Sequence, residues 1–92
     1  MKTKIELTNG TIVEGSLGMA AMRKLRAKDK KLYYQSSRII LQGTADIEEV
    51  SQTIYASYVA INDGEILQQK DFVESLPDSM TEQINILKDL MQ

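Results

Sequence analysis

The sequence predicts an α+β fold, in which an N-terminal β-hairpin packs on a bundle of four to five short helices. Near the N-terminus, polar and apolar residues alternate around an Asn-Gly step, and the rest of the chain repeats apolar residues at helical spacing. A chain of 92 residues has the length of one domain. We therefore expect a single domain over residues 1–92, with the hairpin in 1–15 and the helical part in 16–92.

The hairpin prediction rests on the Asn-Gly step at positions 9–10. This dipeptide is favoured in two-residue type I′ turns, because both central residues of such a turn need positive φ angles. A turn of this kind would pair Leu7 with Ile12 and Ile5 with Glu14. A hairpin on its own is only marginally stable in water, so we expect its apolar face to lie on the helices.

Two helices are expected next, the first over residues 17–28 and the second over residues 30–42. The first has an apolar stripe, formed by Leu17, Ala21, Met22 and Leu25. Its other side is basic and carries Arg23, Lys24, Arg26 and Lys28.

The second helix is expected to begin after Asp29 as N-cap and to end at Gly43. Its inward positions are Leu32, Tyr33, Ser36, Ile39 and Ile40, so Tyr33 is expected to be a half-buried anchor, whereas Tyr34 is placed to contact a partner.

The third helix has the clearest pattern. Asp46 and Glu49 have the spacing of a capping box, with Thr44 as an alternative cap. A core-facing stripe follows, formed by Ile47, Val50, Ile54, Tyr58 and Ile61. The Asn-Asp-Gly sequence at 62–64 is expected to end this helix.

The C-terminal part predicts a short helix over residues 71–76, broken by Pro77, and a final helix after a capping box at Ser79 and Glu82. The apolar stripe of the final helix consists of Met80, Ile84, Leu87 and either Leu90 or Met91. This helix either covers the core or docks on a partner. We favour the first arrangement, because so small a core needs every apolar stripe.

Charge is distributed unevenly along the chain. Residues 1–40 contain nine Lys or Arg and three Asp or Glu, whereas residues 41–92 contain two Lys and ten Asp or Glu. This polarity suits packing between the two halves, head-to-tail self-association, or a charged protein partner. Nucleic acid is not the favoured partner, because DNA- and RNA-binding domains are usually net basic and this chain has a formal charge of -2.

Residue composition argues against catalysis. The chain contains no Cys and no His, so it lacks thiolate ligands, a cysteine nucleophile and the commonest general base near neutral pH. No phosphate-binding glycine loop or serine-nucleophile motif is present either. We therefore expect no enzyme activity, no catalytic residue, no cofactor and no metal.

The apolar runs are too short for a signal peptide or a membrane span, which predicts a cytoplasmic protein without a membrane partner.

The order of these segments resembles a known family. A lysine-rich hairpin, "KIELTNGTIVEGS", leads into the basic "MAAMRKLRAKDKKLYYQ", followed by "IILQG", "IEEVSQTIYASYVAI" and "KDFVESLPDSM". This pattern is similar to the small tail assembly chaperones of long-tailed (siphovirus-type) phages and prophages of Gram-positive bacteria. The resemblance implies a non-catalytic assembly factor in the cytoplasm of the bacterial host cell. It would bind the tape-measure protein and help bring tail-tube subunits to it, without active-site residues.

The candidate partner-binding residues form two groups. The electrostatic group comprises Arg23, Lys24, Arg26 and Lys28, with Tyr34 beside it, and the apolar group comprises Met80, Ile84, Leu87 and Met91. Self-association into a homo-oligomer is left open. Two alternative functions remain: a small regulator that binds nucleic acid through residues 23–34, and a structural adaptor subunit of a phage head–tail complex.

Overall fold

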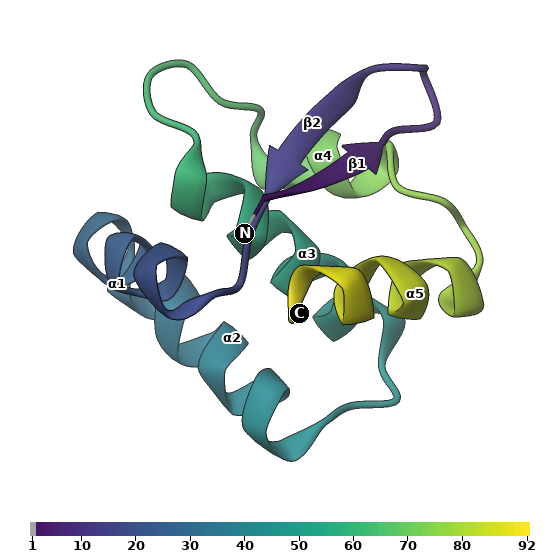
Figure 1. Cartoon of the computed structure of the whole chain (residues 1–92). Helices are drawn as coiled ribbons and strands as arrows, with labels where there is room; N and C mark the ends of the chain where they lie inside the picture. The colour runs from purple at the N-terminus through teal and green to yellow at the C-terminus, as the bar shows by residue number, and fades with distance from the viewer. Residues whose placement is uncertain (1) are drawn as a thin grey trace.

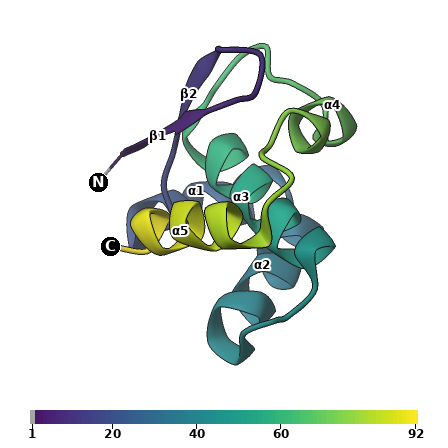
Figure 2. The same ribbon diagram turned by 90° about the vertical axis from the view of Figure 1, so that its right-hand side faces the viewer.

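The computed structural model describes residues 2–92 and has a two-stranded antiparallel hairpin followed by five helices (Figure 1). This confirms the predicted α+β class. The elements in order are β1 (Thr3–Glu6), β2 (Ile12–Gly15), α1 (Met19–Lys28), α2 (Lys30–Gln42), α3 (Ile47–Ile61), α4 (Gln69–Glu74) and α5 (Met80–Leu90). The hairpin lies at one end of the molecule, and the C-terminal end of α2 projects at the opposite end (Figure 2).

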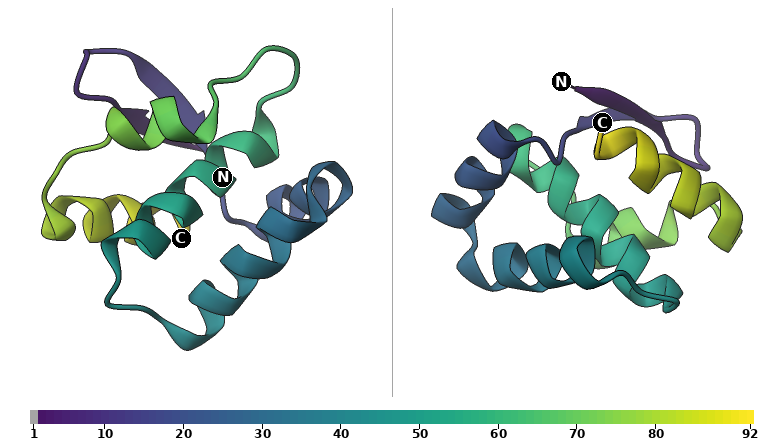
Figure 3. Two further views of the ribbon diagram at one scale, coloured as in Figure 1. Left: turned by 180° about the vertical axis from the view of Figure 1, so that it is seen from behind. Right: turned by 60° about the horizontal axis from the view of Figure 1, so that its bottom comes forward.

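Helix α3 is the centre of the fold. It packs against the other four helices and against β2, and the views from behind and below show it surrounded by them (Figure 3). The predicted stripe is buried at Val50, Ile54 and Tyr58 and only partly buried at its two ends. The other faces of α3 are buried as well, through small residues that include Ser51, Thr53, Ala56, Ser57 and Ala60. The predicted stripe therefore covers only part of the buried surface of α3. Small side chains on its other faces let neighbouring elements pack closely there as well.

The register of the hairpin corrects the sequence-based prediction. Ile5 pairs with Val13 and Glu6 with Ile12, so the second strand is shifted by one residue relative to the expected pairing. The loop has three residues rather than two: the Leu7 amide donates to the Thr11 carbonyl at 2.8 Å. Gly10 has φ +87° at the end of this loop, as in hairpins that combine a β-turn with a bulge. The shift changes the face of every residue in β2, which leaves Ile12 exposed on the outer face.

The predicted N-cap residues are confirmed, but the capping box at Asp46 is not, because the Glu49 carboxylate binds Thr44 and Arg38 instead. Some helix boundaries also differ. The carboxylates of Asp29 and Asp46 accept hydrogen bonds from Leu32 and Glu48 amides, and the Ser79 hydroxyl accepts one from the Glu82 amide. Gly43 ends α2 with φ +75°. Helix α1 begins two residues later than expected, at Met19, and α4 begins two residues earlier, at Gln69. Leu17 is nevertheless buried, in the extended segment before α1.

Helix α5 covers the core, which is the arrangement that the sequence favoured. It packs along α3 and contacts β1, and Leu90 is almost completely buried. Its other buried residue is Gln83, which the apolar stripe did not include. The Gln83 amide oxygen accepts a hydrogen bond from the Ser51 hydroxyl at 2.6 Å, and its nitrogen donates to the Pro77 carbonyl at 2.7 Å. A buried amide satisfied on both sides holds α5 in one position on α3.

Gly15, at the end of β2, lies very close to α3. A Cβ atom on this glycine would lie 2.4 Å from the Ser57 hydroxyl oxygen and 3.1 Å from the side chains of Ile5 and Leu90. We expect Gly15→Ala to lower the free energy of unfolding by about 1–3 kcal/mol through overpacking. Urea denaturation followed by circular dichroism measures this. The control is Gly18→Ala, whose Cβ would meet its nearest neighbour at 3.5 Å. Equal effects of the two substitutions would contradict the packing argument.

Candidate partner-binding surface

The basic residues of α1 lie on its solvent side. Arg23, Lys24 and Arg26 are exposed, while Ala21 and Leu25 on the opposite side are buried against the core. In residues 2–92, the ion pairs are Lys28–Asp63 and Arg38–Glu49, so none involves these three cations. Their charges therefore remain available to an acidic partner.

Lys28, the fourth predicted cation, has a role inside the fold. Its ammonium donates to the carbonyls of Val59 at 3.0 Å and of Ala60 and Asn62 at 3.2 Å. It also lies 2.8 Å from the Asp63 carboxylate. Carbonyls at a helix C-terminus lack intrahelical donors and carry partial negative charge, so a cation stabilises them. Lys28 thus caps α3, and we do not count it among the cations available to a partner.

Tyr34 lies at the corner between α1 and α2 and is 56% exposed. Its hydroxyl is 3.3 Å from the Nη2 atom of Arg26, and its ring meets the half-buried Tyr33 edge to face at 5.2 Å between centroids. The Arg26 guanidinium also lies over the Tyr33 ring at 6.0 Å. The two tyrosines and Arg26 therefore form one ordered surface with an aromatic and a cationic part.

An apolar groove of about 210 Å³ lies between α2 and α5. Its lining residues are Ile39, Ile40, Gly43, Thr44, Val50, Ile84, Leu87, Lys88 and Met91. Three of the four predicted apolar contact residues are thus brought together here. The fourth, Met80, is at the other end of α5 and packs against the core. We call this feature the α2–α5 groove.

Two large apolar side chains are exposed in or near the segments that line the α2–α5 groove. Met91, at the end of α5, lines the groove and is 46% exposed. Leu41 is 84% exposed on the last turn of α2, next in sequence to the lining residue Ile40, and is not itself a lining residue. Leu41 was not among the residues predicted from the sequence, although a signal was present. The apolar run at 39–41 spans more of the helix circumference than one core-facing stripe can bury, so one of its residues must face outward.

Helix α2 connects the two parts of this surface. Tyr34 is near its first turn, beside the cations of α1, and the α2–α5 groove is at its last turn. Because α2 has 13 residues, the two parts are separated by up to about 20 Å along its axis. A ligand that reached both would have to be an extended polypeptide or a helix of several turns.

The junction between α2 and α3 is held by a small polar cluster beside the α2–α5 groove. The Thr44 hydroxyl donates to the Glu49 carboxylate at 2.6 Å, and Arg38 forms an ion pair with the same group. These two interactions, the Thr44 hydrogen bond first, hold the pKa of the Glu49 carboxyl below its usual range. The cluster therefore ties α2 and the connection after it to the first turn of α3.

Residues 2–92 contain no group of three or more His, Cys, Asp or Glu that could hold a metal ion. No helix in this part of the chain is long and apolar enough to cross a membrane. Comparison of the chain with protein-family models, curated proteins and solved structures finds no match.

Two substitutions on α1 distinguish the capping role of Lys28 from the general effect of removing one positive charge on stability. We expect Lys28→Met to lower the free energy of unfolding by about 1–3 kcal/mol, because the substitution leaves the carbonyls at the end of α3 without a charged donor. Lys24→Met removes one exposed charge from the same helix and should have little effect. Urea denaturation of both variants measures the difference, and comparable losses would contradict the role of Lys28.

The Asp63 carboxyl gives a pH-dependent test of the same contact. Its hydrogen bond with Lys28 and the charge of that ammonium hold the pKa of Asp63 below its usual range. The stabilisation that this contact gives the fold is therefore present at neutral pH, and it is lost as the pH falls through the folded-state pKa of Asp63. In an NMR titration, Lys28→Met should raise the pKa of Asp63 towards its ordinary value. An unchanged Asp63 titration would show that the contact does not form in solution.

Proposed function

We propose that this protein is a non-catalytic tail assembly chaperone of a siphovirus-type phage or prophage. It acts in the cytoplasm of the bacterial host cell, binds the tape-measure protein and helps recruit tail-tube subunits. The resemblance of the segment order supports this proposal, and the observation that carries it is the apolar α2–α5 groove, with Met91 exposed in its lining and Leu41 exposed on the last turn of α2. Such a groove suits a helical polypeptide partner.

The proposed ligand of the α2–α5 groove is an amphipathic helix of the tape-measure protein. Helices of this kind insert apolar residues spaced three and four apart into grooves between helices. A groove of about 210 Å³ accepts one or two side chains, each contributing about 1.5–3 kcal/mol on burial. After the entropy of association is subtracted, one copy binds weakly. Many weak sites along a long helical protein allow a coat that loads and detaches reversibly.

The cations of α1 contribute a second, longer-range attraction. Arg23, Lys24 and Arg26 are exposed on α1, and Arg26 contacts Tyr34 of α2, so an acidic segment of the same ligand could reach them while another part fills the α2–α5 groove. Attraction between exposed charges mainly raises the rate of association and weakens as salt is added. It therefore favours encounter with the partner, while the groove determines how long the partner stays.

Co-expression with the long helical protein encoded in the same tail gene cluster tests the groove. We expect Leu41→Glu with Met91→Glu to reduce recovery of that protein in a pull-down by at least about tenfold, since carboxylates would replace the exposed apolar contacts. The matched control is Met19→Glu with Ile12→Glu, two exposed apolar residues on other elements. Equal recovery with both double variants would contradict the proposal.

Reversal of the α1 charges tests the electrostatic part. The triple variant Arg23→Glu, Lys24→Glu, Arg26→Glu leaves Lys28 and its cap in place. We expect slower association with the tape-measure protein at low salt and a smaller difference from the wild type at about 1 M salt, where the Debye length is about 3 Å. Biolayer interferometry at several salt concentrations measures this, and identical rates at low salt would count against it.

A nucleic-acid-binding regulator is the second candidate, because the exposed Tyr34 beside Arg26 could stack on a base. Fluorescence anisotropy with generic single- and double-stranded oligonucleotides distinguishes the two functions. The chaperone proposal expects little binding at physiological salt, whereas a regulator would bind tightly and lose affinity steeply as salt increases. Loss of such binding in the triple variant would establish the regulator instead.

A further inference from the structure

One edge of the two-stranded sheet is open. The outer edge of β2 is partly covered, because the Asn62 side chain donates to the Glu14 carbonyl at 2.8 Å and the Ser16 amide donates to the Ser57 carbonyl at 3.1 Å. Within residues 2–92, the backbone groups of Thr3–Glu6 have no hydrogen-bond partner outside the ladder with β2. The outer edge of β1 therefore has donors and acceptors available for another strand.

The groups along this edge belong to Lys4 and Glu6. In an antiparallel pair, alternate residues direct their amide and carbonyl towards the neighbouring strand or away from it. The Leu7 amide bonds to Thr11 across the hairpin, so Leu7 and Ile5 face β2. The amides and carbonyls of Lys4 and Glu6 accordingly face outward. Their side chains lie on the solvent face of the sheet, since Ile5 and Leu7 are buried on the other face.

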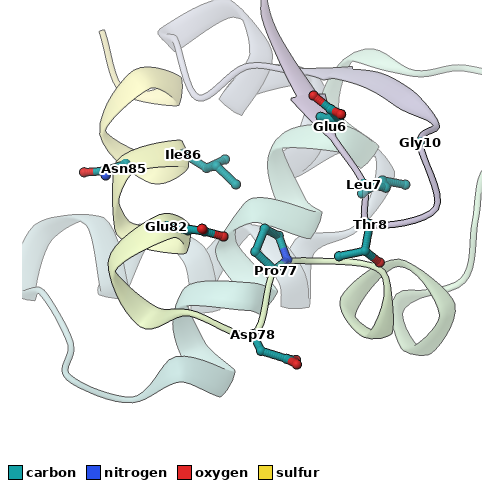
Figure 4. A pocket seen from close by; sticks show the side chains of 9 residues that line it. All are labelled: Glu6, Leu7, Thr8, Gly10, Pro77, Asp78, Glu82, Asn85 and Ile86. Carbon is teal, nitrogen blue, oxygen red and sulfur yellow. The ribbon is translucent and has the colours of Figure 1, made fainter.

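A groove of about 630 Å³ lies beside this edge, between the hairpin and α5. It is lined by Glu6, Leu7, Thr8, Gly10, Pro77, Asp78, Glu82, Asn85 and Ile86. Figure 4 shows Glu6 and Thr8 on the hairpin side, Glu82 on α5 and Asp78 at the end between them. The lining includes three carboxylates and no lysine or arginine. The space beside the β1 edge is thus acidic.

We propose that this edge pairs with β1 of a second copy of the chain, in antiparallel register centred on Ile5. Lys4 then lies opposite Glu6 of the second copy, and Glu6 opposite its Lys4, so the outward amides and carbonyls face each other and two cross-strand ion pairs form. The charge sequence of β1 is therefore complementary to itself. The pairing ends after Glu6, because the Thr8 amide already donates to the Ser75 carbonyl at 2.8 Å.

Neighbouring registers are less favourable. A shift of two residues in either direction places two Lys4 or two Glu6 side chains directly opposite each other, and like charges at such positions are destabilising. A shift of one residue moves the outward backbone groups out of alignment. The central register gives a closed dimer with the same surface on both copies and a continuous four-stranded sheet. This inference does not rest on the proposed function and holds for any role of the chain.

Charge exchange tests the register. The wild type is expected to show a concentration-dependent dimer in sedimentation velocity. Lys4→Glu places two carboxylates opposite each other at both symmetry-related positions and should weaken dimerisation by roughly tenfold or more. Adding Glu6→Lys restores opposite charges and should recover the dimer. The control is Lys70→Glu, the same charge change on α4. A wild type that is monomeric up to millimolar concentration, or a folded double variant without recovery, would overturn the proposal.

Cysteine pairing provides a second measurement that does not depend on charge. The chain has no cysteine, so Lys4→Cys and Glu6→Cys variants can be mixed and oxidised. Residues opposite each other have Cβ atoms about 4.5–5.5 Å apart, compared with about 7–8 Å for diagonal neighbours. The mixed disulfide should therefore predominate over both homodisulfides. If the homodisulfides form as readily as the mixed disulfide, the strands do not pair in this register.

Discussion

The rest of the structure depends on the packing of five elements around α3. Its small side chains, including Ala56, Ser57 and Ala60, are buried and leave room for close neighbours. Gly15 approaches Ser57 so closely that a Cβ atom would overlap it. Because a chain of this length can form only a modest core, one shared helix allows each outer element to bury a single face. The remaining faces of α1, α2, α5 and β1 are then free to form surfaces for other molecules.

Polar contacts hold the ends of these elements, and two of these contacts are ion pairs between basic and acidic residues. Lys28 joins the end of α1 to the end of α3, and Arg38 with Glu49 joins α2 to the start of α3. Both ion pairs connect the basic N-terminal part of the chain to its acidic C-terminal part. The fold therefore engages two of the basic side chains internally, while Arg23 and Lys24 stay exposed.

Local features were predictable from the sequence, whereas features that depend on distant contacts were not. The caps at Asp29, Asp46 and Ser79 were identified because each involves residues two or three positions apart. The hairpin register was wrong, because an Asn-Gly step fits loops of different lengths and the burial of β1 decides between them. The α2–α5 groove brings together helices distant in sequence, so only three of its residues were identified beforehand as contacts. The capping role of Lys28 depends on α3 in the same way.

We therefore propose a division of the molecule into a closely packed centre, α3, and binding surfaces on the elements around it. Hydrogen–deuterium exchange of the chain with and without the tape-measure protein tests this division directly. We expect new protection in residues 39–43 and 84–91, which border the α2–α5 groove, and little change in α3, whose amides are already protected. New protection confined to α4 and the adjoining loops, or no change anywhere in the presence of saturating partner, would contradict this division.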